Sequence, residues 1–360
     1  MSGHELVRDL GEVGLGDRAT VGGKAASLGE LSRAGIRVPA GYVVTVEAFE
    51  RALRALDPGG AIRREIERLP ASDLAAVAEA TERVRARIAG APLPQDVREQ
   101  IVARYRGLGS PGAGEGGAAV AVRSSATGED GAETSFAGLQ DTYLWVRGAD
   151  AVTDQVRRCW ASLYNAEAVG YRRRLKLSEP DLAMAVVVQR MVEPRCAGVM
   201  FTCSPTTGDR SVVIVEACWG LGSALVSGDV TPDRFVVSKV TGEIVSRVVV
   251  PKLRLHRRDP GGCGVTAADV PGPLREQACL TDAEIAALAR VGRRVEEHYG
   301  VPQDIEWAIT EGEGIVLLQS RPETVWARRR TGPVAAPRAR AVDHVFEQLG
   351  RVNPVREPGH

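Results

Sequence analysis

The side chains with the most obvious chemical potential lie in the last two predicted strands. In DIEWAI, the two-residue period of a strand places Asp304 and Glu306 on one face and Ile305 on the other. If GIVLLQSR pairs back as the next strand, Gln319 and Arg321 share a face beside the acids. Two carboxylates, an amide oxygen and a guanidinium would suit a magnesium ion next to a bound anion. The alternative is a ladder of surface ion pairs.

Two positions nearer the N-terminus have features of anion-binding sites. Gly22, Gly23 and Lys24 open a predicted helix, and helix N-termini offer free backbone N–H groups to phosphates. Lys24 is also one of four lysines among 46 basic residues, which favours a role for a compact point charge over a general preference for arginine. The alternative is a solvated cation at a helix start.

Arg123 closes an apolar strand, where a charge is costly unless it meets an anion. The loop that follows, up to Gly138, is rich in hydroxyls and glycines and could fold over a polyphosphate as a lid. The alternative is a surface loop, with Arg123 paired to Glu129 or Asp130. Further along, Gln189–Val192 ends a very apolar strand, and its free backbone groups could hold an adenine ring.

Helical patterns dominate the first part of the chain and strands the later part. We expect a helix at 22–35, a short strand at 43–45, about four helices over 46–107, and two helices ending at 175. Strands are expected at 119–125, 141–146, 184–192, 197–204, 211–220, 234–240 and 243–250, and in a final hairpin over 304–321. Thr281 and Glu284 form a capping box that opens a helix running to Gly300. This order predicts an α+β fold with two lobes, at 1–190 and 191–326, and a tail at 327–360.

Composition excludes several classes of protein. The 360 residues carry 46 basic and 46 acidic side chains, which argues against nucleic acid or an anionic membrane as the main partner. No apolar run approaches the roughly 20 residues that span a bilayer, and the N-terminus has no apolar signal segment. The six cysteines form no CxxC pair, so a disulfide framework is not expected. These features favour a cytoplasmic protein.

Five blocks of the sequence, in the right order over residues 8–326, resemble one known domain. The blocks are GGKAASLGEL, AVRSSATGEDGAETSFAGLQDTYLWV, VVVQRMVEPRCAGVMFTCSP, EACWGLGSALVSGDVTPD and QDIEWAITEGEGIVLLQSRPET. They are similar to the ATP-grasp nucleotide-binding domain shared by pyruvate phosphate dikinase, phosphoenolpyruvate synthase and rifampin phosphotransferase. This resemblance implies a two-lobed ATP-grasp fold with Mg-ATP held in the cleft between the lobes.

The resemblance also implies a role for each matching position. Lys24 and Arg123 would contact phosphates, Arg321 would reach the γ-phosphate, and these three cations would neutralise charge during transfer. Gly138 and Thr142 would lie in the loop over the β- and γ-phosphates. The remaining positions would hold adenine (Gln189, Met191 and Val192) and magnesium (Asp304, Glu306 and Gln319). One departure is Glu167, which stands where relatives usually carry an arginine.

A second departure concerns the phosphoryl acceptor. Multidomain relatives carry a catalytic histidine in a Thr-Cys-His-Ala-like segment, and none of the five histidines here (His4, His256, His298, His344 and His360) lies in one. His256 and His298 are interpreted as structural or solvated. We therefore expect a freestanding ATP-dependent phosphotransferase module that passes a phosphoryl or pyrophosphoryl group to a separate histidine carrier or a small molecule. The alternatives are a ligase that forms an acyl phosphate and a non-catalytic ATP-binding regulator.

Overall fold

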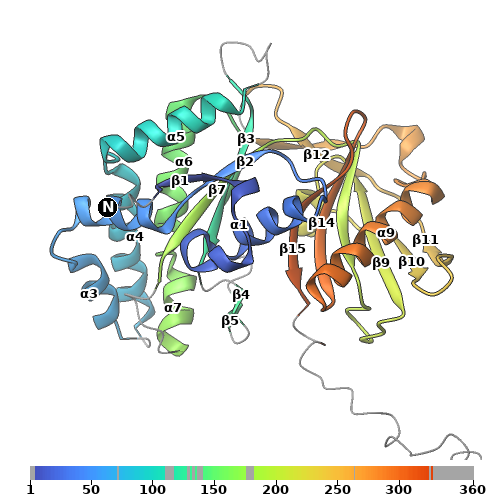
Figure 1. The fold of residues 1–360 in the computed structure, drawn as a ribbon, viewed down its shortest axis with the longest axis horizontal. Coiled ribbons are helices and arrows are strands. Elements are labelled where there is room, and N and C mark those ends of the chain that lie inside the picture. Colours follow the sequence, from blue (N-terminus) through green and yellow to red (C-terminus); the bar gives the residue numbers. More distant parts are fainter. Residues whose placement is uncertain are drawn as a thin grey trace, which may run out of the picture.

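Two antiparallel sheets lie side by side in the computed structural model, and most helices surround the first of them (Figure 1). The structure describes residues 5–70, 73–109, 117–127, 130–131, 134–135, 141–175, 182–262, 264–323 and 326. Gly138 and the expected tail at 327–360 lie outside the described residues.

The first sheet has the strand order β1-β2-β7-β3-β6. Its strands are β1 (Val7–Asp9), β2 (Gly41–Val44), β3 (Val120–Ala126), β6 (Thr142–Val146) and β7 (Met184–Arg190). The helices expected over 46–107 are α2 (Val46–Leu56), α3 (Ala61–Arg68), α4 (Leu74–Gly90) and α5 (Gln95–Gly107), followed by α6 (Ala149–Ser162) and α7 (Ala166–Leu175). The predicted block of about four helices over 46–107 and the two helices ending at 175 are therefore confirmed.

β7 is apolar from Met184 to Val188 because both of its faces are covered. Successive residues of a strand point to opposite faces. Val186 and Val188 pack on one side in a core that includes Trp160 of α6. Val187 packs on the other side with Leu28 of α1 (Arg18–Arg33). The first sheet thus lies between α1 on one face and helices that include α2 and α6 on the other.

The second sheet has the strand order β11-β10-β9-β8-β14-β15. Its strands are β8 (Cys196–Phe201), β9 (Val212–Trp219), β10 (Asp233–Ser238), β11 (Ile244–Val248), β14 (Gln303–Thr310) and β15 (Gly314–Pro322). Helix α9 (Asp282–Tyr299) starts at the predicted Thr281–Glu284 capping box and ends at Gly300, which adopts the left-handed conformation. Its Ile285 and Leu288 pack in the core of this sheet.

Helix α1 connects the two sheets. It contacts β3 and β7 of the first sheet and β15 of the second. The Ser27 hydroxyl donates to the Ser320 carbonyl of β15 at 2.7 Å, and Glu30 pairs with His298 of α9 at 2.8 Å. Because α1 contacts both sheets, it fixes how β3 faces the β14–β15 hairpin.

Several short elements were not predicted from the sequence. They are helix α8 (Ser223–Val226), the hairpin β12 (Arg254–Arg258) and β13 (Val265–Asp269), and the two-residue pair β4 (Asp130–Gly131) and β5 (Thr134–Ser135). None of the helices in the described part of the chain has the length and apolar character needed to span a bilayer. Five cysteines (Cys159, Cys196, Cys203, Cys218 and Cys279) are buried free thiols.

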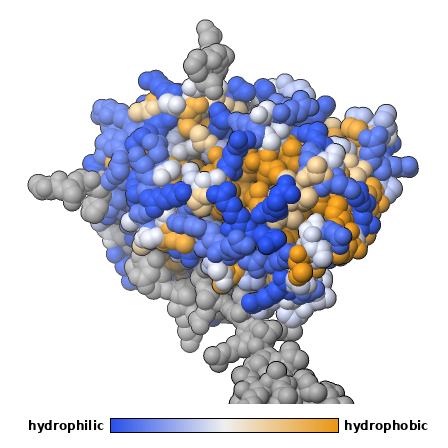
Figure 2. Space-filling view, turned by 45° about the vertical axis from the view of Figure 1, so that its right-hand side comes forward, coloured by the Kyte–Doolittle hydropathy of each residue, from blue (hydrophilic) through white to orange (hydrophobic). Residues whose placement is uncertain are grey.

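Some large apolar side chains remain exposed on the second sheet, including Val245 and Val248 of the edge strand β11. Figure 2, which brings the side of this sheet forward, shows hydrophobic side chains gathered on one face and bordered by hydrophilic ones.

Candidate functional site

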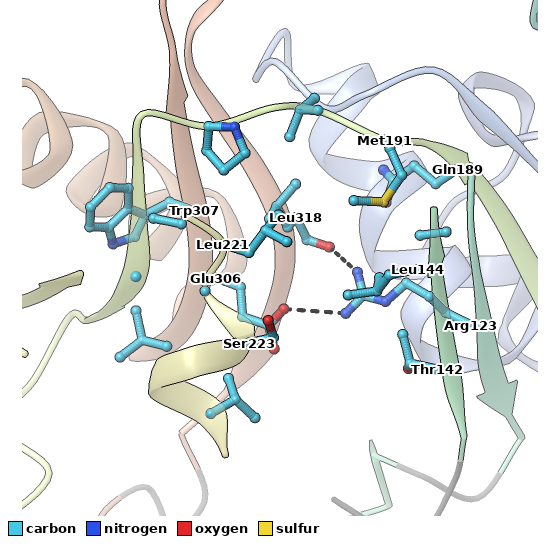
Figure 3. A pocket seen from close by; sticks show the side chains of 18 of the residues that line it. Arg123, Thr142, Leu144, Gln189, Met191, Leu221, Ser223, Glu306, Trp307 and Leu318 are labelled. Carbon is cyan, nitrogen blue, oxygen red and sulfur yellow. Dashed lines mark hydrogen bonds and ion pairs between the residues drawn. The ribbon is translucent and has the colours of Figure 1, made fainter. Parts of the chain in front are cut away.

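A cavity of about 320 Å³ is lined by residues of both sheets (Figure 3). Most of its wall is apolar, with side chains such as Leu144 from β6, Leu221 before α8 and Leu318 from β15. A cavity of this size with a few polar groups is typical of a small-molecule site. Six of the predicted site residues line it: Arg123, Thr142, Gln189, Met191, Val192 and Glu306.

The polar end of the cavity is built on the β14–β15 hairpin. Asp304 lies opposite Arg321 and Glu306 opposite Gln319, so the predicted pairing of acids with the polar residues of the next strand is confirmed. The register shifts directly after Glu306, where β15 contains one extra residue. This bulge includes Leu318, whose side chain lines the cavity beside Glu306.

Arg123 reaches from β3 to this hairpin and joins the two sheets. It donates to the Leu318 carbonyl at 2.7 Å, to Gln319 Oε1 at 2.7 Å and to Glu306 Oε2 at 3.2 Å. Its side chain is 12% exposed, whereas that of Glu306 is 33% exposed. The Nε atom of Arg123 is buried and has no hydrogen-bond partner among the described residues. Arg123 lies in the middle of β3 and does not close the strand as expected, because β3 continues to Ala126. This cation is held by oxygens of the opposite sheet and has its Nε–H group left to donate.

Asp304 and Arg321 form a second pair on the same hairpin. Arg321 donates to Asp304 Oδ2 through Nε at 2.9 Å and through an amino group at 2.7 Å. Burial raises the pKa of Asp304, Arg321 opposes this shift, and the neighbouring Glu306 and Glu323 add to it. Asp304, Gln319 and Arg321 do not line the cavity themselves. They flank it through the hairpin that carries Glu306.

The other end of the cavity lies where β7 passes into the connection to β8. The Met191 N–H donates to the Ala119 carbonyl at 2.9 Å, and the buried Gln189 side chain donates to the Pro39 carbonyl at 3.1 Å. These bonds fix the turn, while the side chains of Met191 and Val192 remain on the cavity wall. This end therefore offers an apolar surface and backbone groups of the segment after Met191.

Lys24 lies apart from the cavity lining. It follows a kink at Gly22, where φ is 74° and a Cβ atom would come within 2.0 Å of the Ser125 carbonyl oxygen. Only glycine permits this approach. Ser125 closes the contact, because its hydroxyl donates to the Val21 carbonyl at 2.8 Å and accepts from the Ala25 N–H at 3.1 Å. The backbone around Lys24 is thus held against Ser125 of β3, two residues beyond Arg123.

Two further positions named in the sequence analysis, Glu167 and Gly138, are not among the described residues that line the cavity. Glu167, in the first turn of α7, is exposed and does not line the cavity. Gly138 is outside the described residues. In the described part of the chain, no cluster of three or more His, Cys, Asp or Glu side chains is placed to hold a metal ion.

Sequence reasoning missed two polar residues near the site. Glu216 of β9 lies across Val199 from Glu306, and burial raises its pKa, with Arg234 opposing the shift. A charge inside the apolar run SVVIVEACW was the signal that could have identified it. Ser223 of α8 lines the cavity and had no such signal in the sequence.

The pyruvate phosphate dikinase AMP/ATP-binding domain is the family whose model matches this sequence, over residues 18–341. The chain belongs to this family. Its α+β architecture, with helices and two antiparallel sheets, agrees with the predicted ATP-grasp-like fold.

Curated relatives are considerably longer than this chain. It is 43% identical over 313 residues to a probable phosphoenolpyruvate synthase of Methanothermobacter thermautotrophicus, covering 87% of this chain and 45% of that protein. It is 41% identical over 362 residues to the phosphoenolpyruvate synthase of Aeropyrum pernix, covering 92% and 44%. It is 42% identical over 325 residues to a rifampicin phosphotransferase of a Streptomyces species, covering 90% and 36%. The chain therefore spans less than half the length of these relatives.

Proposed function

We propose that this chain is the nucleotide-binding part of an ATP-dependent phosphotransferase. It would bind Mg-ATP in the cavity between the sheets and transfer a phosphoryl or pyrophosphoryl group to an acceptor outside this domain. The observation that carries the proposal is Arg123, a largely buried cation that crosses from one sheet to the carboxylate and amide oxygens of the other. Membership of an AMP/ATP-binding family supports the same conclusion.

The two ends of the cavity suit the two ends of ATP. The apolar wall near Met191 and Val192 would receive the adenine ring, and backbone groups of this turn would recognise its polar edge. Arg123 would bind phosphate oxygens, using the Nε group that has no partner among the described residues. Thr142, which lies opposite Arg123 in the β3–β6 pairing, would contact the same phosphates.

The residues beside Arg123 fit a magnesium ion. Magnesium prefers oxygen ligands and usually combines one or two carboxylates with phosphate oxygens. Glu306, Gln319 and Asp304 supply two carboxylates and an amide oxygen on one hairpin. When bound, magnesium would neutralise the charge of the phosphate chain. Arg123 and Arg321 would then turn from these oxygens to the phosphates, and Lys24 would add a third cation.

Binding and chemistry can be tested separately. We expect saturating Mg-ATP to raise the melting temperature, because a ligand that binds only the folded state stabilises it by mass action. An unchanged melting temperature together with no heat of binding in calorimetry would refute the nucleotide assignment. Product analysis, with candidate carrier proteins and small molecules added, would then distinguish ADP from AMP as the product and identify the acceptor.

A further inference from the structure

We infer that Ser223 is an activated nucleophile that accepts a phosphoryl group from the nucleotide in the cavity. Ser223 lines the cavity, and its hydroxyl lies 3.0 Å from Nδ1 of His256. Nε2 of the same ring lies 3.2 Å from Oδ2 of Asp229. A hydroxyl, an imidazole and a carboxylate in this order are the arrangement that activates a serine in nucleophilic catalysis. The inference rests on the proposed binding of ATP in this cavity.

The contacts of His256 indicate which of its nitrogens would act as the base. The Asp229 carboxylate lies 3.2 Å from Nε2, so a proton on Nε2 would be stabilised by its negative charge. In the neutral ring, Nδ1 then has a lone pair and accepts from the Ser223 hydroxyl. The Ser227 hydroxyl donates to the same oxygen of Asp229 at 2.7 Å and holds the carboxylate in place. His256 would therefore be the base for Ser223, a role beyond the structural or solvated one expected from the sequence.

Backbone contacts hold the histidine against helix α8. The Leu221 N–H donates to the His256 carbonyl at 2.9 Å, and Gly220 forms a bridge with His256. Gly220 has φ of 71°, and a Cβ atom there would lie 2.4 Å from the His256 carbonyl oxygen. The glycine thus permits β12 to approach the turn before α8. Ser223 and His256, 33 residues apart, are brought together by this contact.

The electrophile follows from the position of Ser223 in the cavity. Figure 3 shows Ser223 on the same side of the cavity as Glu306, facing Arg123. These are the residues proposed to hold the phosphate chain and its metal. Ser223 Oγ would attack the γ-phosphorus, and the bond from that phosphorus to the β,γ-bridging oxygen would break. ADP would leave, and the Oγ proton would pass to Nδ1 of His256 and then to solvent. The product is a phosphoserine.

The test uses the chain incubated with Mg-ATP labelled in the γ-phosphate. Phosphoserine survives acid that hydrolyses phosphohistidine and acyl phosphates, so the acid-stable label is measured and its site is identified by mass spectrometry. We expect label on Ser223 and none in Ser223→Ala. Loss of a general base costs on the order of 10²-fold or more, so labelling should slow by at least that factor in His256→Gln. His298→Gln is the matched control, because His298 also pairs with a carboxylate but touches no serine of the cavity.

Two results would overturn the inference while leaving the proposed function intact. One is a wild-type chain that is stabilised by Mg-ATP and acquires no acid-stable label at Ser223. The other is labelling of Ser223 at equal rates in wild type, His256→Gln and Asp229→Asn. The Asp229 side chain is 56% exposed, so Asp229→Asn should fold normally. This variant keeps the role of the Asp229–His256 pair testable if His256→Gln fails to fold.

If Mg-ATP neither binds nor stabilises the chain, the proposed function fails and the nucleophile is tested without nucleotide. A fluorophosphonate probe carries its own electrophilic phosphorus. Its reaction with Ser223, dependent on His256, would support the activated serine. Failure of the probe to label Ser223 would overturn it.

Discussion

Replacing Arg123 by methionine is expected to change the binding of free metal and of metal-bound nucleotide in opposite directions. Without a ligand, Arg123 donates to Glu306 and Gln319, the same oxygens that we propose for magnesium. Arg123 therefore competes with a metal ion for these oxygens. When nucleotide is present, the same guanidinium would bind phosphate, so its loss should weaken binding.

The size of the first effect follows from the geometry of the ion pair. Two unit charges 3.2 Å apart attract by about 5 kcal/mol at an effective dielectric constant of about 20. The Glu306 side chain is 33% exposed and hence partly screened by water. A net value of about 1–2 kcal/mol is therefore expected, between those of exposed and buried pairs. Arg123→Met should accordingly bind free metal about 5–30 times more tightly.

The second effect is larger and of opposite sign. A hydrogen bond to a charged group contributes about 1.5–3 kcal/mol, so loss of Arg123 should weaken Mg-ATP binding by about 10–150-fold. Mn²⁺, which is visible by electron paramagnetic resonance, can replace magnesium in the titration without nucleotide, and calorimetry measures Mg-ATP binding. Arg190→Met is the matched control for the metal titration, because Arg190 of β7 pairs with Glu313 of the same hairpin at 2.7 Å and leaves Glu306 unaltered. If Arg123→Met binds free metal no more tightly than the control, or binds Mg-ATP as wild type does, the assignment of these oxygens is wrong.

Three further substitutions test the same site. Glu306→Ala should lose most of the magnesium-dependent ATP affinity, measured by calorimetry. Its free energy of unfolding, measured by urea denaturation, should fall by only about 1–2 kcal/mol, the value of the pair with Arg123. Unchanged ATP affinity would favour a ladder of surface ion pairs. Lys24→Arg should fold normally, as circular dichroism can show, but lose turnover by about 10²-fold, and near-full turnover would remove the role of this ammonium. Because burial raises the pKa of Asp304, its ionised form lowers the free energy of unfolding at any pH above the ordinary pKa of aspartate. In that pH range, Asp304→Asn should therefore have a higher free energy of unfolding than wild type. Lowering the pH through the raised pKa of Asp304 should therefore increase the free energy of unfolding and weaken Mn²⁺ binding. An Mn²⁺ affinity that does not change with pH would exclude Asp304 as a ligand.

Periodicity predicted the faces of the strands but not the contacts between sheets. The two-residue period placed Asp304 and Glu306 on one face, and the hairpin pairs them with Arg321 and Gln319 as expected. The sequence could not reveal that Arg123 contacts Glu306, 183 residues away, because this contact depends on how α1 fixes one sheet against the other. It also could not reveal the bulge that includes Leu318, since an extra residue inside an apolar strand leaves the pattern unchanged.

The Ser223 relay was missed for a related reason. Helix α8 has four residues, and the strands of the β12–β13 hairpin contain no fully buried residue, so neither produces a strong hydrophobic period. The only local signal was glycine at 220, which the sequence marks as a turn but not as a contact with His256. Sites assembled by backbone packing between short, polar elements remain hidden from patterns along the chain.

The scarcity of lysine has a physical explanation that extends beyond Lys24. Lys252 is 1% exposed and pairs with the fully buried Asp233 at 2.6 Å, and Lys239 pairs with Glu296. These two of the four lysines therefore occupy confined sites in which an ammonium fits a carboxylate and a guanidinium would need more room, and Lys176 lies outside the described residues. The scarcity of lysine thus indicates, by itself, a cation in a confined site and not a phosphate-binding site. Lys24 itself is half-buried, and it follows the Gly22 kink, where the backbone lies against Ser125 too closely for any side chain. Lys252→Arg is consequently the right comparison for Lys24→Arg: the first should reduce stability, and only the second should reduce phosphoryl transfer at unchanged stability.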